Sequence, residues 1–147
     1  MTDKIHLTVA AVVCQNHKYL MVRERSENII VINQPAGHVE PGESPLAAVQ
    51  RETLEETGWL VEPRYLLNFS VFTSSENHVT YYRLTFICKP LSEQRNPKID
   101  PDILDILWLS RQEFLSAGTP RSPMVQQAID DYEAGIRYPL EFIRDYR

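Results

Sequence analysis

The sequence predicts an α/β fold in which helices pack on a mixed β-sheet. Strand-like runs open the chain, one well-marked helix interrupts them, and further strands and two short helices follow. A sheet with an apolar face has to bury that face against other elements, and here the helices are available to cover it. The 147 residues are enough to bury a substantial core, so we expect one domain over residues 1–147.

Three apolar runs before the helix predict the first strands. They cover residues 5–14, 18–25 and 29–32, and the first of them is rich in Val. In the second run Arg23 and Arg25 alternate onto one face of the pleat, since successive side chains of a strand point to opposite sides. The residues from Pro35 to Glu43 are rich in turn formers and predict a loop.

Local signals predict a helix between residues 45 and 57. Ser44 can cap its first turn, Pro45 suits the first helical position, and Gly58 suits a left-handed stop. After it, strands are expected at 60–73, 79–89 and 103–109, with a charged, proline-containing loop over 90–102. Short helices are expected after Ser110 and after Ser122.

Three carboxylates share one side of the predicted central helix. Glu52, Glu55 and Glu56 stand at spacings i, i+3 and i+4, which places them on the same face. Like charges so placed repel each other, and a bound divalent cation would compensate them. Arg51, four residues before Glu55, can brace that carboxylate. A solvated acidic face is the alternative interpretation of the three acids taken alone.

The wider spacing is more specific than the three acids. The pattern is Gly37, five residues, Glu43, seven residues, Arg51-Glu52, two residues, Glu55-Glu56, one residue, Gly58. It resembles the Nudix box in every charged and glycine position and departs from it only at packing positions such as Thr53. The resemblance implies a Nudix hydrolase with an α/β/α sandwich, built as a single Nudix domain over residues 1–147.

The resemblance also implies a metal site. Glu52, Glu55 and Glu56, with the Gly37 carbonyl, would hold Mg²⁺, or Mn²⁺ in its place, against a diphosphate, and Arg51 would orient the carboxylates. The loop before Trp108 often supplies a further acid in this family, so Asp102 is a candidate metal ligand. Asp105 and, more weakly, Glu76 are other candidates. The base that activates the water is Glu52 or an acid of the Asp102 region.

Five residues are candidates for binding the substrate. Arg23, Arg25 and Arg83 are expected on a concave sheet face, where guanidinium groups could clamp phosphate oxygens. Tyr81 could stack on a ring of the substrate, and His38 directly follows the loop glycine. Exposed strand arginines, a packing tyrosine and a structural histidine are the alternatives.

Segments outside the box narrow the resemblance. Residues 33–38 (NQPAGH), 121–123 (RSP) and 137–141 (RYPLE) look like the NudJ-type phosphatases of bacteria. That subgroup is described as releasing orthophosphate from nucleoside di- and triphosphates and from hydroxymethylpyrimidine pyrophosphate, and thiamine pyrophosphate is a related candidate. Two alternatives stay open: an ADP-ribose or dinucleotide pyrophosphatase that releases a mononucleotide, and a nucleotide-sensing module without activity.

Composition excludes several other classes. A formal net charge of −5 argues against a nucleic-acid surface, and no run approaches the ~20 apolar residues of a membrane span. Cys14 and Cys88 lie in separate apolar runs and read as buried thiols, so a cytoplasmic protein is expected. The expected partner is a small nucleotide or organic pyrophosphate, bound by a monomer or homodimer.

Overall fold

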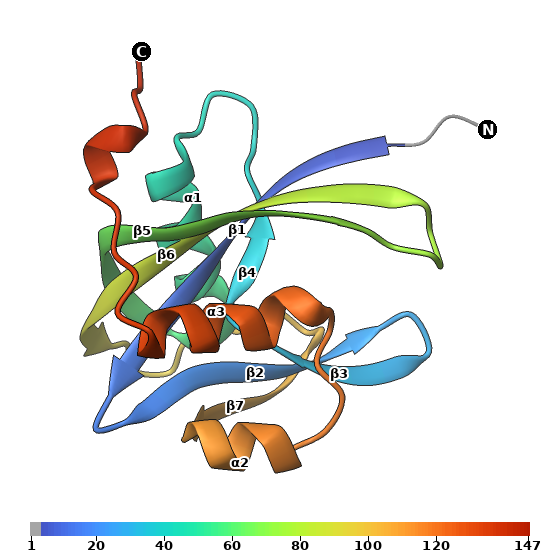
Figure 1. Ribbon diagram of the computed structural model, residues 1–147. Helices are drawn as coiled ribbons and strands as arrows, with labels where there is room; N and C mark the ends of the chain where they lie inside the picture. The colour runs from blue at the N-terminus through green and yellow to red at the C-terminus, as the bar shows by residue number, and fades with distance from the viewer. Residues whose placement is uncertain (1–3) are drawn as a thin grey trace.

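The computed structural model describes residues 4–147, which form one sheet with helices packed on it (Figure 1). In chain order the elements are β1 (Lys4–Gln15), β2 (Lys18–Ser26), β3 (Ile29–Asn33), β4 (Ala36–His38), α1 (Pro45–Thr57), β5 (Trp59–Thr73), β6 (Val79–Glu93), β7 (Ile103–Leu109), α2 (Arg111–Ser116), α3 (Pro123–Glu133) and a short 3₁₀ turn at Leu140–Phe142. None of the described helices combines the length and apolarity needed to cross a membrane.

The sheet is mixed, as predicted. Its strands run in the order β3-β2-β1-β6-β5, with β4 added to β1 and β7 added to β2. β1 and β6 are parallel, and the other paired strands are antiparallel. β1 therefore lies at the centre and joins the two halves of the sheet.

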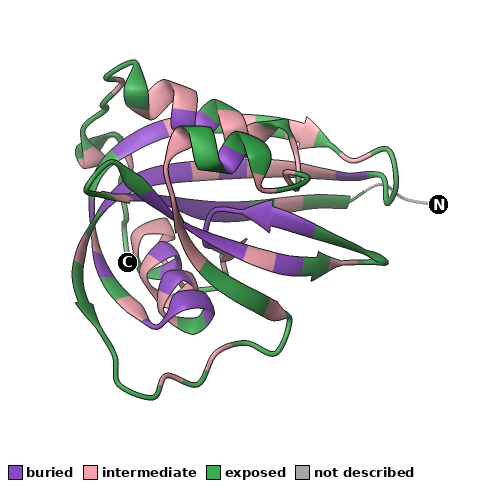
Figure 2. Ribbon diagram, turned by 90° about the horizontal axis from the view of Figure 1, so that it is seen from below, coloured by how far each residue is buried: buried purple, intermediate pink, exposed green. Residues whose placement is uncertain are grey.

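Helices cover both faces of the sheet, which gives the expected sandwich. Val9, Ala11 and Val13 of β1 pack in one cluster with Ala48 and Val49 of α1. The next residue in the alternation, Val12, packs in a second cluster that includes side chains of α2 and α3, among them Phe114 and Ile129. Buried residues accordingly concentrate in the strands between the two helical layers (Figure 2).

The local signals around α1 work as the sequence predicts. The Ser44 hydroxyl accepts a hydrogen bond from the Ala47 amide, and Pro45 occupies the first turn. At the other end Gly58 adopts a left-handed conformation (φ 77°), and its N–H donates to the Leu54 carbonyl. These caps fix where the helix begins and ends, and hence the positions of its carboxylates along the helix.

Two segments differ from the prediction. Residues 36–38, expected in a loop, form β4 because Gly37 pairs with Val9 on the antiparallel edge of β1. β6 continues to Glu93, beyond the expected end at residue 89, because the start of β5 extends alongside it and pairs as far as Trp59 with Glu93. Such pairings depend on a distant partner strand and leave little local signal.

Candidate active site

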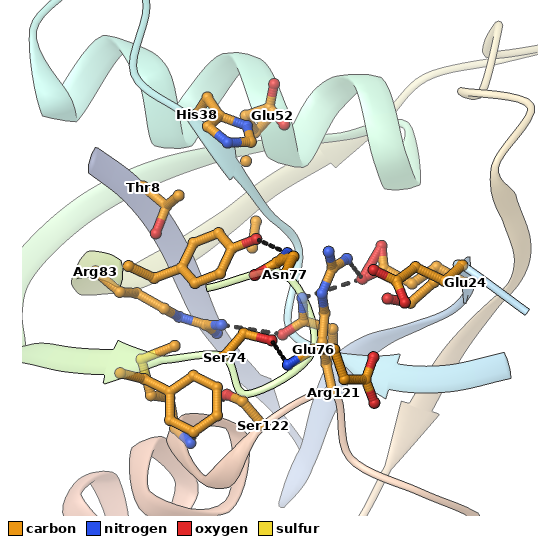
Figure 3. Close-up of a pocket in the computed structure, with 18 of the residues that line it drawn as sticks. Thr8, Glu24, His38, Glu52, Ser74, Glu76, Asn77, Arg83, Arg121 and Ser122 are labelled. Atoms are coloured by element: carbon orange, nitrogen blue, oxygen red, sulfur yellow. Dashed lines mark hydrogen bonds and ion pairs between the residues drawn. The ribbon is translucent and has the colours of Figure 1, made fainter. Parts of the chain in front are cut away.

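A pocket of about 260 Å³ gathers side chains from both halves of the sheet (Figure 3). The box helix α1 contributes Glu52 and Glu56, and β4 contributes Gly37 and His38. Opposite elements add residues of β2, β6, the β5–β6 hairpin and the loop before α3, including Glu24, Arg83, Glu76 and Arg121. The pocket therefore combines the box carboxylates with two guanidinium groups.

Glu56 is a buried carboxyl group at this pocket. Glu56 is only 8% exposed, and one of its carboxylate oxygens accepts a hydrogen bond from the Ala36 amide at 3.0 Å. The pKa of Glu56 is raised to about 9, chiefly by burial and to a smaller extent by the negative charges of Glu24 and Glu52, while the hydrogen bond from Ala36 opposes the rise. A nearby cation would reverse this cost and favour the ionised form.

Glu52 lies directly against the backbone of Gly37. A Cβ atom placed on Gly37 would lie 1.6 Å from Glu52 Oε2, so only glycine leaves room for the carboxylate. Burial raises the pKa of Glu52, while the hydrogen bond and charge of Arg51 lower it. The requirement for glycine here comes from this close approach, because Gly37 is not among the residues with positive φ.

Arg51 holds the acids around the site together. Its guanidinium donates to both oxygens of Glu43 at 2.6 and 2.9 Å and to Glu52 Oε1 at 2.5 Å. It also donates to Glu55 Oε1 at 2.8 Å, which is the contact predicted from their spacing, and to the His38 carbonyl at 3.0 Å. The hydrogen bond from Arg51 lowers the pKa of Glu43. Arg51 leaves Glu52 Oε2 free.

The three box carboxylates do not form a ready-made metal cage. Glu52 and Glu56 line the pocket, whereas Glu55 is exposed and turned to Arg51 outside it. Within residues 4–147 no three Asp, Glu, His or Cys side chains converge closely enough to form such a cage. The three acids do not all face one point in this arrangement, so a metal site built from all of them stays a prediction.

The loop before β7 also differs from the prediction. Asp102 is exposed and does not line the pocket, and Asp105 forms an ion pair with Arg23. The acid of this loop that acts on the site is Asp100, whose charge raises the pKa of both Glu52 and Glu56. Asp102 instead bonds through its backbone N–H to the Asp100 carboxylate, which helps to hold that loop.

Only one of the three predicted arginines reaches the pocket. Arg83 of β6 lines it and is only 4% exposed. Arg23 Nη1 lies 2.7 Å from Asp105 Oδ2, and Arg25 is exposed away from the pocket lining. The shared face is wrong because Arg23 and Arg25 flank Glu24 in β2: successive side chains point to opposite faces, and Glu24 is the one that lines the pocket with Arg83.

Tyr81 and His38 both line the pocket, as expected for substrate-binding candidates. Tyr81 accepts a hydrogen bond from the Asn77 side chain at 3.1 Å. His38 Nε2 lies 2.9 Å from Nδ1 of His6, a neighbour that the sequence did not single out. Burial lowers the pKa of His38, followed by the charges of His6 and Arg121, so a neutral imidazole is favoured there.

Sequence reasoning missed Glu24 and Arg121 as pocket residues. Glu24 is 6% exposed, and its Oε1 accepts hydrogen bonds from Arg121 Nη1 at 2.8 Å and from Asn33 Nδ2 at 3.1 Å. Glu24 carried a weak signal, since it is an acid inside a strand of buried residues. Arg121 belongs to the RSP segment that resembles the NudJ-type phosphatases and precedes the Ser122 helix cap, but neither feature indicates that its side chain reaches the pocket.

Known proteins resemble this one in fold and in sequence, over most of its length. The NUDIX domain family model matches residues 4–128. The phosphatase NudJ of Escherichia coli strain K12 is 36% identical over 143 residues, which cover 97% of this chain and 93% of that protein. A NUDIX hydrolase structure from Nitrosomonas europaea has 43% identity and a TM-score of 0.93, covering 97% of this chain and 98% of that one. A MutT NUDIX hydrolase from Burkholderia pseudomallei, at 19% identity and a TM-score of 0.74, shares the fold alone, over 87% of this chain and 98% of that one. The chain therefore belongs to the Nudix family and is a hydrolase that acts on phosphoric anhydrides.

Proposed function

We propose that this enzyme is a Mg²⁺-dependent phosphatase that releases orthophosphate from terminal diphosphates. Its substrates would be nucleoside di- and triphosphates and small organic pyrophosphates such as hydroxymethylpyrimidine or thiamine pyrophosphate. The observation that carries the proposal is one small pocket that holds Glu52, Glu56 and Gly37 together with a buried arginine, Arg83. The similarity to the NudJ phosphatases supports the same activity.

The donor set fits a divalent metal ion, which Nudix hydrolases generally use. Five acidic residues line the pocket, namely Glu24, Glu27, Glu52, Glu56 and Glu76. Only two arginines line it, so an anionic diphosphate needs a cation beside it. Mg²⁺ commonly binds through one or two carboxylates, with substrate phosphates and water completing its shell. Glu52, Glu56 and the Gly37 carbonyl would hold it here. Glu55, kept outside by Arg51, and Asp102 are left out of this set.

Glu52 is the residue best arranged to accept the proton of the attacking water. When bound, Mg²⁺ offsets the charge of the diphosphate and lowers the pKa of water. Arg51 occupies Glu52 Oε1 and leaves Oε2 available as the proton acceptor. Arg83 would stabilise the negative charge of the phosphate oxygens.

The size of the pocket favours a substrate with a single ring. Pockets for drug-sized ligands have roughly 300 to 1,000 Å³, and this one has about 260 Å³. A pyrimidine or one nucleoside with its diphosphate partly projecting into solvent suits that volume better than a dinucleotide. Phe72 and Tyr81 supply aromatic surface for such a ring.

A substrate panel with Mg²⁺ tests the proposal. It comprises nucleoside di- and triphosphates, hydroxymethylpyrimidine and thiamine pyrophosphates, ADP-ribose and NADH, with orthophosphate and mononucleotides measured separately. We expect orthophosphate from the terminal diphosphates. AMP from ADP-ribose or NADH without orthophosphate elsewhere would replace the proposal with a dinucleotide pyrophosphatase.

The Glu56→Gln variant tests the role of the box carboxylate. We expect Mg²⁺-dependent turnover to fall at least about 100-fold, since the amide removes the negative charge next to the metal. Glu62→Gln, an exchange of the same kind at an ion-paired residue outside the pocket, is the control and should retain activity. Wild-type turnover in folded Glu56→Gln would contradict the assignment.

The proposal includes the setting of the enzyme. A free small molecule is its partner, without nucleic acid or membrane, and it works in the cytoplasm as a monomer or homodimer. Cys14 and Cys88, both within the described residues, are free thiols, which suits a reducing compartment.

A further inference from the structure

Within residues 4–147 the buried charge of Arg83 has no carboxylate partner in direct contact. Its Nη1 and Nη2 donate to the side-chain oxygens of Asn33 and Gln34 at 3.2 and 2.6 Å, and both partners are neutral amides. Its Nε is buried and has no hydrogen-bond partner among residues 4–147. Burying a cation with only neutral partners is costly, so this guanidinium favours an anion arriving in the pocket.

Arg121 brings a second guanidinium to the same pocket from the loop before α3. The loop is pinned to the edge of the sheet, because the Ile32 amide donates to the Thr119 carbonyl and the Arg121 amide donates to the Ile32 carbonyl, each at 2.8 Å. These backbone bonds hold the start of the Arg121 side chain over the pocket. Figure 3 shows Arg121 among the residues that line the pocket, together with Glu76 and Ser122.

Glu24 fixes the direction of Arg121 without using up its hydrogen-bonding capacity. Arg121 Nη1 donates to Glu24 Oε1 at 2.8 Å, and this is the one side-chain hydrogen bond that Arg121 makes within residues 4–147. The Glu24 side chain is 8% exposed, whereas that of Arg121 is 41% exposed. Arg121 thus keeps free N–H groups, which can donate to an oxygen of a ligand.

The charge of Arg121 is felt by Arg83 and by His38, which lies on the other wall of the pocket. Burial lowers the pKa of Arg83 to about 10, and the charge of Arg121 is the next largest cause. The same charge contributes to the lowered pKa of His38 on β4. Two like charges that oppose each other at one pocket are both stabilised by an anion that binds to them.

We propose that Arg121 is a substrate-binding residue that donates hydrogen bonds to non-bridging phosphate oxygens of the diphosphate, and that Glu24 is the positioning residue that aims it. This inference rests on the proposed function for its substrate. It assigns the diphosphate a place between the box carboxylates and the pair Arg83 and Arg121. An arginine fork suits this task because it can bind two phosphate oxygens at once.

Kinetics of Arg121 variants test this assignment. In Arg121→Gln we expect KM for the best diphosphate substrate to rise at least about tenfold while kcat changes less than about threefold, since the lost bonds serve binding. Arg121→Lys keeps the charge but loses the fork, so its KM should fall between the two. Arg111→Gln is the matched control, because it breaks an ion pair to Asp130 that joins α2 and α3 and lies outside the pocket. An unchanged KM in folded Arg121→Gln would overturn the proposal.

A double-mutant cycle separates positioning from general stability. Glu24→Gln should raise KM about threefold or more in the wild-type background but add little to Arg121→Gln, because the two residues act as one unit. Equal effects of Glu24→Gln in both backgrounds would overturn the positioning role. Thermal melting of all four proteins shows which fraction is folded in each assay.

Calorimetric binding of α,β-methylene-ADP with Mg²⁺ distinguishes failure of this inference from failure of the proposed function. The analogue contains a diphosphate that cannot be hydrolysed between its phosphorus atoms, so binding is measured without turnover. If the wild type turns over no terminal diphosphate but binds the analogue at least tenfold more tightly than Arg121→Gln, the role of Arg121 stands and the proposed activity falls. Equal binding by the two proteins overturns the role of Arg121 whatever the activity.

Discussion

Replacing Gly37 with Ala adds a methyl group in a position that Glu52 already occupies. The new Cβ would lie 1.6 Å from Glu52 Oε2, 2.1 Å from Cδ and 2.7 Å from Cγ. Favourable contacts between such atoms lie near ~3.5 Å, so the carboxylate has to retreat by about 2 Å. The change thus displaces the acid that we expect to accept the proton, while the backbone of β4 can remain paired with β1.

The expected loss is large for activity and small for stability. A displacement of about 1 Å at a reacting group can cost a factor of about 100 in rate, which corresponds to about 3 kcal/mol of transition-state stabilisation. We therefore expect kcat/KM of Gly37→Ala to fall at least about 100-fold. The free energy of unfolding should fall by no more than about 1.5 kcal/mol, the value of the hydrogen bond from Arg51 that Glu52 stands to lose.

The assay compares Mg²⁺-dependent orthophosphate release with urea unfolding for two glycine variants. Gly42→Ala is the control: its Cβ would meet no atom within 4 Å, but its φ of +79° strains any residue with a side chain. That strain costs about 1–2 kcal/mol of stability, and activity should stay near wild type. Wild-type kcat/KM in Gly37→Ala would refute the reasoning, because the position of Glu52 would then not limit the reaction.

Two further predictions concern the network around Arg51. Arg51→Lys replaces a planar fork by a point charge that cannot bind Glu43, Glu52 and Glu55 together. We expect kcat, measured by steady-state kinetics, to fall about tenfold or more. The free energy of unfolding, measured in urea, should fall by about 1–3 kcal/mol. Arg51 also lowers the pKa of Glu43 below its usual 4.5. The stabilisation by Glu43 is therefore present above pH 4.5 and lost as the pH falls through the lower folded value. Between pH 6 and pH 3 the Tm of Glu43→Gln should accordingly fall less than that of the wild type. An equal fall would show that the pair Arg51 and Glu43 does not contribute to stability.

The sequence determined the elements whose signals are local. Ser44, Pro45 and Gly58 act within a few residues of the helix ends, and their capping geometry appears in the structure as predicted. The alternation in β6 likewise separated Arg83 from the apolar residues that face α1, because the period of a strand follows from its backbone. The spacing of the box was also sufficient to identify the family.

Only the tertiary structure decided which of the predicted residues share a pocket. Helical spacing put Glu52, Glu55 and Glu56 on one side of α1. In the structure Glu52 and Glu56 line the pocket beside β4, whereas Glu55 lies outside it and accepts a hydrogen bond from Arg51. Alternation alone gave no means to choose among the three strand arginines. The choice followed from the parallel pairing of β1 with β6, a contact between segments more than 70 residues apart.

Arg121 marks the limit of sequence reasoning most clearly. It lies in a loop without periodicity, and it reaches the pocket because backbone hydrogen bonds attach that loop to β3, nearly 90 residues earlier. Its partner Glu24 comes from a strand in which an acid is otherwise out of place. Capping and periodicity are set by neighbouring residues and can be read from the chain, whereas the meeting of distant side chains depends on how the whole sheet is assembled.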